Sequence, residues 1–214
     1  HDPSTAYMAA TRYKLDDFKP YLYKTTNYGK SWKLITTGIA KDAYTRVVRE
    51  DPTRKGLLYA GTETGLYISF DDGKNWKPFQ LNLPVVPVTD LLVKENDLVV
   101  ATQGRAFWIL DDLTPLYQLS GKISGAKAHL FDPRDTYRLP GGGGWGGPSP
   151  NSGANPPNGV MTFFTLSEEL GEDGEFTLEY LESDGDVIKT FTNKKDEKSS
   201  EPTAETKKGM NRFV

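Results

Sequence analysis

An eight-residue segment that occurs twice constrains the fold more than any other feature of the sequence. The two copies are TTNYGKSW (25–32) and SFDDGKNW (69–76), which begin 44 residues apart, and each follows a short aromatic segment, PYLYK or GLYI. They share a hydroxyl residue first, Asn or Asp third, Gly fifth, Lys sixth and Trp eighth. A period of 40 to 45 residues with about four short strands per unit is typical of the blades of a β-propeller.

A third copy, LVVATQGRAFWILDDLTPLY, follows 41 residues later and aligns Ala101 with Ala60 and Asp112 with Asp71. Leu110 and Thr114 replace its hydroxyl and glycine, so we expect a different turn there. The pattern predicts about three blades within residues 1–119, at the C-terminal end of a propeller. Because known propellers have at least about four blades, we expect the remaining blades of the same protein to be partners of this segment.

The rest of the chain predicts a second β-rich region. Residues 120–159 form an exit segment and a Gly/Pro-rich linker. Residues 160–214 contain four strand-like segments, VMTFFTL, GEFTLEYLE, DVIKTFT and MNRFV, which predict a partial immunoglobulin-like β-sandwich. A polar segment near 193–209 predicts a mobile charged loop. The expected fold class is therefore all-β, and both ends of the sequence resemble cuts within a longer protein.

Composition excludes several classes of function. The chain has no cysteine and two histidines, His1 and His129, which argues against a metal site, a cysteine nucleophile and a Ser-His-Asp triad; no cofactor is expected. A net charge of −3 without a long basic run argues against nucleic acid as a partner. No apolar run approaches the ~20 residues of a membrane helix, so no membrane insertion is expected.

The repeated segment is acidic in one copy only, which favours a structural role over a catalytic one. Asp71 and Asp72 of the second copy correspond to Asn27 and Tyr28 of the first. A calcium loop or a catalytic carboxylate pair would not survive this exchange, whereas Asn and Asp both accept backbone hydrogen bonds in turns. The residues expected to build these turns are Thr25, Asn27, Gly29, Trp32, Ser69, Asp71, Gly73, Trp76 and, in the third copy, Asp112.

TTNYGKSW and SFDDGKNW resemble the Asp-box of bacterial neuraminidase repeats, as found in sialidases, sortilin-type receptors and xyloglucan-degrading propellers. LLYAGTETGLYISFDDGKNW, NDLVVATQGRAFWILDDLTPL and GMNRFV resemble more closely the large exported bacterial proteins labelled sortilin-like or glycosyl-hydrolase-like repeat proteins. The resemblance implies that the box joins the two outer strands of a blade, away from the catalytic face. It also implies a secreted, periplasmic or cell-surface location.

Two loops, GTETG and TQGRA, are expected to join inner blade strands and to face the axial opening of the propeller. Glu63, Gln103 and Arg105 are then candidates for hydrogen bonds to a ligand. Alternatively, Arg105 pairs with Asp111 or Asp112 and locks the last blade. Trp145, within GGGGWGG, is expected either to stack on a sugar or a partner, or to hold its loop against the propeller.

These patterns predict a non-catalytic binding or scaffold module of a larger exported bacterial protein, with a protein or glycan partner. The alternative is part of a sialidase-like or xyloglucanase-like glycoside hydrolase whose catalytic residues lie mostly outside this chain. Glycosidases need two carboxyl groups about 5–9.5 Å apart. Glu63, Asp90 and Asp111 are available, but no sequence pattern brings two of them together, and no catalytic residue is assigned.

Overall fold

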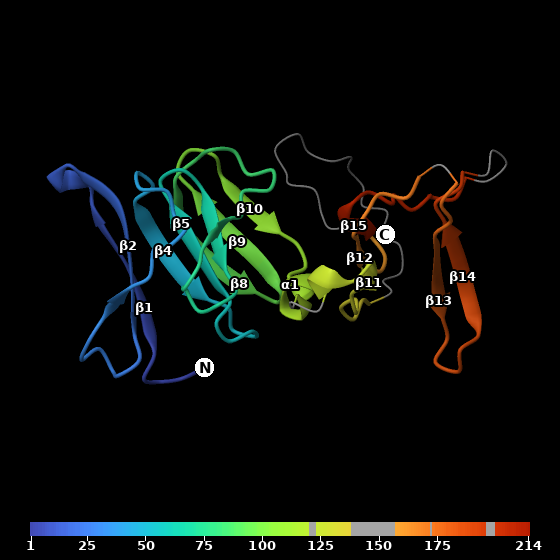
Figure 1. Ribbon diagram of the computed structural model, residues 1–214, viewed down its shortest axis with the longest axis horizontal. Coiled ribbons are helices and arrows are strands. Elements are labelled where there is room, and N and C mark those ends of the chain that lie inside the picture. Colours follow the sequence, from blue (N-terminus) through green and yellow to red (C-terminus); the bar gives the residue numbers. More distant parts are fainter. Residues whose placement is uncertain (120–122, 138–156, 172, 196–199) are drawn as a thin grey trace, which may run out of the picture. The chain divides into compact units, whose positions relative to one another are not determined.

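The computed structural model describes residues 1–119, 123–137, 157–171, 173–195 and 200–214 of the chain. These residues form two compact units, His1–Leu113 and Thr114–Val214 (Figure 1). The strands pair antiparallel throughout the described sheets. The structure is therefore all-β, as the sequence predicts.

The first unit, described over its whole length, contains three sheets in which neighbouring strands follow one another in sequence. Such meanders, stacked in chain order, are the architecture of propeller blades. Blade 1 comprises β1 (Ala6–Arg12), β2 (Asp17–Thr25) and β3 (Lys33–Leu34), with the short 3₁₀ helix η1 (Tyr13–Leu15) between β1 and β2. Blade 2 comprises β4 (Thr45–Glu50), β5 (Leu58–Thr62), β6 (Leu66–Ser69) and β7 (Lys77–Pro78). Blade 3 comprises β8 (Val88–Lys94), β9 (Asp97–Thr102) and β10 (Phe107–Leu110).

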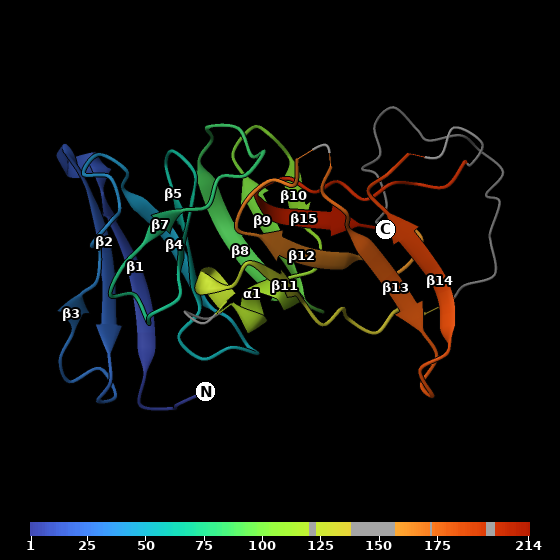
Figure 2. The ribbon, with the colours of Figure 1, turned by 45° about the vertical axis from the view of Figure 1, so that its right-hand side comes forward.

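The two copies of the repeated segment occupy equivalent places in their blades. The first copy joins β2 to β3, and the second joins β6 to β7. Blade 1 therefore supplies counterparts of β5, β6 and β7, whereas blade 3 supplies counterparts of β4, β5 and β6. The three blades lie in chain order, from blue to green, in both views of the ribbon (Figures 1 and 2). The first unit is a partial propeller.

Blades 1 and 2 share a continuous apolar core. Leu22 of β2 packs in one cluster with Val48, Leu58 and Ala60 of the facing sheet and with Trp76 of the second repeat. Leu58 and Ala60 alternate along β5, so they lie on the same face of that strand, the face that packs on blade 1. Burial of this shared face removes apolar surface from water, and it stabilises the pair rather than either sheet alone.

Blades 2 and 3 approach each other too closely for a side chain at Gly61. A Cβ atom there would lie 2.6 Å from Val88 Cγ1 of β8 and 2.7 Å from Val47 Cγ1 of β4. Arg49 of β4 adds polar contacts, because its Nε donates to the carbonyl oxygen of Leu91 at 3.0 Å. The glycine of the LLYAGT segment is thus required by the close approach of two sheets.

Described residues of the second unit form two small sheets over a common core. The first sheet comprises β11 (Ala128–Leu130), β12 (Thr162–Leu166) and β15 (Gly209–Phe213), and the second comprises β13 (Thr177–Leu181) and β14 (Val187–Thr192). A short helix, α1 (Thr114–Gln118), and a 3₁₀ turn, η2 (Ile123–Gly125), precede them. Phe164, Leu166, Leu178, Ala204 and Phe213 make up the core. The immunoglobulin-like topology and the predicted domain bounds stay predictions.

The two tryptophans of the repeated segment differ sharply in burial. Trp76 is 3% exposed, and its indole Nε1 donates to the carbonyl oxygen of Ile35 at 2.7 Å. Its backbone nitrogen also donates to the Thr37 carbonyl oxygen. Trp32, at the same position of the first copy, is 42% exposed. The difference arises because the segment that follows blade 1 covers Trp76.

Replacing Trp76 by Phe is expected to lower the free energy of unfolding by about 1–3 kcal/mol, because the buried carbonyl of Ile35 loses its donor. The same change at Trp32 is expected to cost less than about 0.5 kcal/mol, as is usual for an exposed side chain. Urea unfolding followed by circular dichroism measures both. Equal losses at the two positions would contradict this account of how the blades are joined.

Candidate ligand-binding site

In the second repeat, the side chains hold their own turn. Ser69 Oγ accepts hydrogen bonds from the backbone nitrogens of Asp71 (3.4 Å) and Gly73 (3.0 Å), and it donates to Asp71 Oδ1 (2.9 Å). The carboxylate of Asp71 accepts from the backbone and side-chain nitrogens of Asn75, at 2.8 and 2.7 Å. Both oxygens of Asp71 are therefore used within the turn.

The first repeat makes the same bonds with neutral groups. Thr25 Oγ1 accepts from the backbone nitrogens of Asn27 and Gly29 at 3.3 and 3.0 Å. Asn27 Oδ1 accepts from the backbone nitrogen of Ser31 at 2.9 Å. The amide oxygen of Asn27 in blade 1 and the carboxylate oxygen of Asp71 in blade 2 thus accept the same backbone hydrogen bond. The turn therefore needs a hydrogen-bond acceptor and does not need a negative charge.

The environment of Asp71 changes its pKa. Burial acts to raise the pKa of this carboxyl, but the hydrogen bonds from Asn75 and Ser69 outweigh it, so that the pKa is lowered from its usual value. The charged form is therefore the one that the folded turn favours. This is the opposite of the raised pKa that a catalytic acid requires.

Asp72, the second acid of the turn, links two blades. Its Oδ1 accepts from the hydroxyl of Tyr7 on β1, and its Oδ2 pairs with Nζ of Lys24 on β2. Burial, followed by the hydrogen bond to Asp72, raises the pKa of Tyr7. Sequence reasoning missed this contact, because Tyr28 occupies the equivalent position in the first copy and no local pattern marks a partner 48 or 65 residues away.

Glu63 lies in the loop between β5 and β6, where it pairs with Arg46. Nε and one terminal nitrogen of Arg46 lie 2.7 and 2.6 Å from Glu63 Oε2. The backbone nitrogen of Glu63 also donates to the carbonyl oxygen of Tyr44 at 3.0 Å. The attraction between these opposite charges holds both side chains in one partly exposed position at one end of blade 2.

An aromatic cluster adjoins this ion pair. The ring of Tyr44 stacks on Tyr13 with centroids 5.2 Å apart, and Phe18 lies at 6.1 Å from it. The guanidinium of Arg46 lies 5.4 Å from the Tyr44 centroid, and its nitrogen donates to the Tyr44 hydroxyl at 3.2 Å. Tyr44 is buried, whereas Tyr13 and Phe18 are 38% and 47% exposed. The result is an exposed aromatic surface beside a fixed guanidinium–carboxylate pair.

The other predicted ligand-binding residues lie elsewhere or outside the described structure. Gln103 and Arg105 lie exposed in the loop between β9 and β10, which corresponds to the Glu63 loop in the next blade. The backbone nitrogen of Gln103 donates to the Pro87 carbonyl oxygen, and the carbonyl oxygen of Arg105 accepts from Trp108 Nε1. Trp145 lies outside the described residues.

Two further acids named from the sequence have structural contacts. Asp90 pairs with Arg49 at 2.6 Å, between blades 3 and 2. Asp112, which follows β10, is 5% exposed and has a positive φ of 61°, and its backbone nitrogen donates to Asp97 Oδ1 at 2.9 Å. The turn of the third copy therefore differs from the first two, since the short helix α1 follows it in place of an outer strand.

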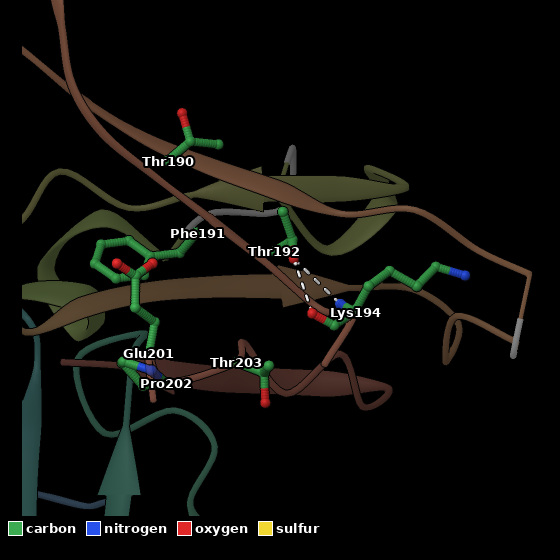
Figure 3. Close-up of a pocket in the computed structure, with 7 residues that line it drawn as sticks. All are labelled: Thr190, Phe191, Thr192, Lys194, Glu201, Pro202 and Thr203. Carbon is green, nitrogen blue, oxygen red and sulfur yellow. Dashed lines mark hydrogen bonds between the residues drawn. The ribbon is translucent and has the colours of Figure 1, made fainter. Parts of the chain in front are cut away.

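A small pocket of about 160 Å³ in the second unit is lined by the end of β14, by Lys194 and by residues 201–203 (Figure 3). Thr192 Oγ1 both donates to the carbonyl oxygen of Lys194 (3.1 Å) and accepts from its backbone nitrogen (3.3 Å). Glu201 on the opposite wall pairs with Lys189. Several polar groups of this pocket are thus bonded to the protein itself, and its geometry assigns it no function.

None of the described helices is long and apolar enough to cross a membrane. Nor do three or more His, Cys, Asp or Glu side chains gather in a way that could hold a metal ion anywhere in the described part of the chain.

Comparison with known proteins gives partial likenesses. No family model matches the chain, and no curated protein matches it either. The chain is similar to an ancestral GH74 enzyme, with 23% identity and a TM-score of 0.39 over 49% of this chain and 12% of the enzyme. It is also similar to YCF48 bound to a D1 peptide, with 22% identity and a TM-score of 0.33 over 43% of this chain and 31% of YCF48. The chain thus spans a minor part of each neighbour.

Acid is expected to destabilise the wild-type protein more than the variant Asp71→Asn. Because folding lowers the pKa of Asp71, its contribution to stability is present above the unfolded pKa of about 3.9 and is lost as the pH falls through the folded value. Asn keeps the acceptor but does not titrate. Melting temperatures recorded between about pH 2 and pH 6 measure the difference, and parallel curves would contradict the assignment.

Proposed function

We propose that the first unit belongs to a propeller that binds a glycan at the end of the blades where Glu63 lies. The observation that carries the proposal is the cluster of Tyr13, Phe18 and Tyr44 beside the Arg46–Glu63 pair. Binding sites combine aromatic surface with a few fixed polar groups that determine orientation. The rings offer a flat apolar face for a sugar ring, and the ion pair offers hydrogen-bond partners for its hydroxyl groups.

The fixed geometry of the cluster favours binding. Arg46 approaches Glu63 through two nitrogens, which restricts both side chains before a ligand arrives. Stacking against Tyr44 similarly restricts the exposed ring of Tyr13. Preorganisation of this kind reduces the entropy lost on binding. A sugar uses both parts of this surface, because its ring stacks on the aromatic side chains while its hydroxyl groups bond to the ion pair; an apolar side chain of a protein partner uses the rings alone.

Further blades are the second expected partner. Leu92, Phe107 and Ile109 are exposed on blade 3. The pairings Leu92–Val99 and Val99–Ile109 place two of them in one row across the sheet. The row lies on the opposite face from the buried Leu91 and Val100. An apolar sheet face of this kind supports contact with another blade, since each blade is stable within a stack. The exported location is proposed from the family resemblance alone.

Binding is tested with soluble neutral polysaccharides, namely xyloglucan, glucomannan and dextran, by isothermal titration calorimetry. We expect at least one to bind, and we expect Tyr13→Ala and Phe18→Ala each to weaken that binding by about tenfold, or about 1.4 kcal/mol, through loss of stacking. The control is Tyr28→Ala, which removes an aromatic ring that is 73% exposed in the first repeat turn. No binding to any of the three, or an equal loss in the control, would overturn the proposal.

The hydrolase alternative makes a different prediction for the same samples. A glycosidase needs a second carboxyl group facing Glu63 across the bound sugar. Release of reducing ends from a polysaccharide that binds, abolished by Glu63→Gln, would favour this alternative. Binding without release would favour a module without chemistry of its own.

A further inference from the structure

We infer that a second ligand site lies between the two repeat turns and takes an anionic sugar residue. A cavity of about 240 Å³ opens there. The first turn and its flanks contribute Lys24, Thr26, Ser31, Trp32, Lys33 and Ile35, and the second turn contributes Asp72 and Lys74. The volume suits one sugar ring, and the lining combines an aromatic residue, hydroxyl groups and cations.

The charge of the cavity is opposite in sign to that of the chain. Three lysines and one aspartate line it, so that its formal charge is +2, whereas the chain carries −3. Asp72 is already occupied, since its two oxygens bind Tyr7 and Lys24. Lys33 and Lys74 form no ion pair with any described residue. Asp71, in the same turn as Lys74, lies outside the lining and has both oxygens bonded to its own turn, but its charge partly offsets that of Lys74, which helps to lower the pKa of Asp71.

Lys33 carries a positive charge without an ion-pair partner among the described residues, and Lys74 carries one that Asp71 offsets only in part, so the lining keeps an excess of positive charge that an anion would neutralise. A partly enclosed cavity strengthens such an attraction, because its walls exclude some of the water that screens exposed charges. The two lysines come from different blades and line the same cavity, so a carboxylate bound to both would be held in one orientation. A carboxylate-bearing ligand therefore fits the cavity better than a neutral one does.

The remaining groups favour a sugar over a bare anion. Trp32 is 42% exposed, so its indole is available to a ligand, in contrast to the buried Trp76. Ser31 Oγ accepts a hydrogen bond from Asn27 Nδ2, which leaves its own proton available for donation. An aromatic ring and a free donor are of use to a sugar ring with hydroxyl groups and of little use to inorganic phosphate. The ligand class is thus a uronic acid or a similarly acidic sugar.

The internal repeat provides a matched control. Lys30 and Lys77 occupy the positions in the repeat that correspond to Lys74 and Lys33, at an offset of 44 residues, yet neither lines the cavity. The double variants Lys33→Gln/Lys74→Gln and Lys30→Gln/Lys77→Gln therefore change the net charge equally, in equivalent turns. A difference between them reports the cavity rather than the overall charge.

The probe is tri-galacturonate, titrated into the 214-residue chain while tryptophan fluorescence is recorded, with neutral galactotriose, sulfate and phosphate in parallel. We expect tri-galacturonate to bind more tightly than any of the other three. We also expect binding to weaken at least about fivefold when the salt concentration is raised from about 0.05 to 0.5 M.

The variants decide where the probe binds. We expect Lys33→Gln/Lys74→Gln to weaken binding by at least about tenfold and Lys30→Gln/Lys77→Gln by less than about twofold. Absence of tri-galacturonate binding, or equal losses in the two double variants, would overturn the site. Sulfate or phosphate binding as tight as that of tri-galacturonate would overturn the assignment of a sugar. Circular dichroism of each variant establishes that a loss of binding is not a loss of fold.

Discussion

The burial of one blade's face against the next is the interaction on which the rest of the first unit depends. A sheet of three or four short strands has two faces, and its apolar side chains need a neighbour to exclude water. Trp76 concentrates this effect, because its ring enters the shared core while its indole nitrogen satisfies a buried carbonyl of the preceding segment. Asp72 adds a polar contact across the same junction. Apolar burial and the polar contacts of Asp72 thus join the same two blades.

The stack also determines which loops lie together at its ends. At one end of the stack, Arg46 of β4 and Glu63 of the β5–β6 loop lie beside exposed aromatic rings. Turns between the outer strands leave a basic cavity between successive blades. Neither surface belongs to one blade. Tyr13 lies in blade 1, and Tyr44 lies in the segment just before β4 of blade 2. Similarly, Lys33 belongs to β3 of blade 1, and Lys74 belongs to the turn between β6 and β7 of blade 2. Binding at either place would therefore depend on intact contact between blades.

Most acids that the sequence brings to attention are engaged in structural contacts. Asp71 caps its own turn, Asp72 joins two blades, and Glu63 and Asp90 pair with arginines. The lowered pKa of Asp71 reflects this engagement, because hydrogen bonds to a carboxylate stabilise its charged form. Acidic residues in repeated turns thus need not indicate catalysis, and the exchange of Asp71 for Asn27 between the copies has a direct structural reason.

The all-β class, the blade repeat and the positions of the two turns follow from the sequence, because strand alternation and turn chemistry act over a few neighbouring residues. It also named Glu63 as a candidate ligand-binding residue, which stays a prediction. The partners of Asp72, the stacking of Tyr13 on Tyr44 and the unequal burial of Trp32 and Trp76 arise only when the blades pack together. These contacts join residues tens of positions apart, and the repeat makes Trp32 and Trp76 equivalent in sequence. Only the stacking of one blade on another makes them different.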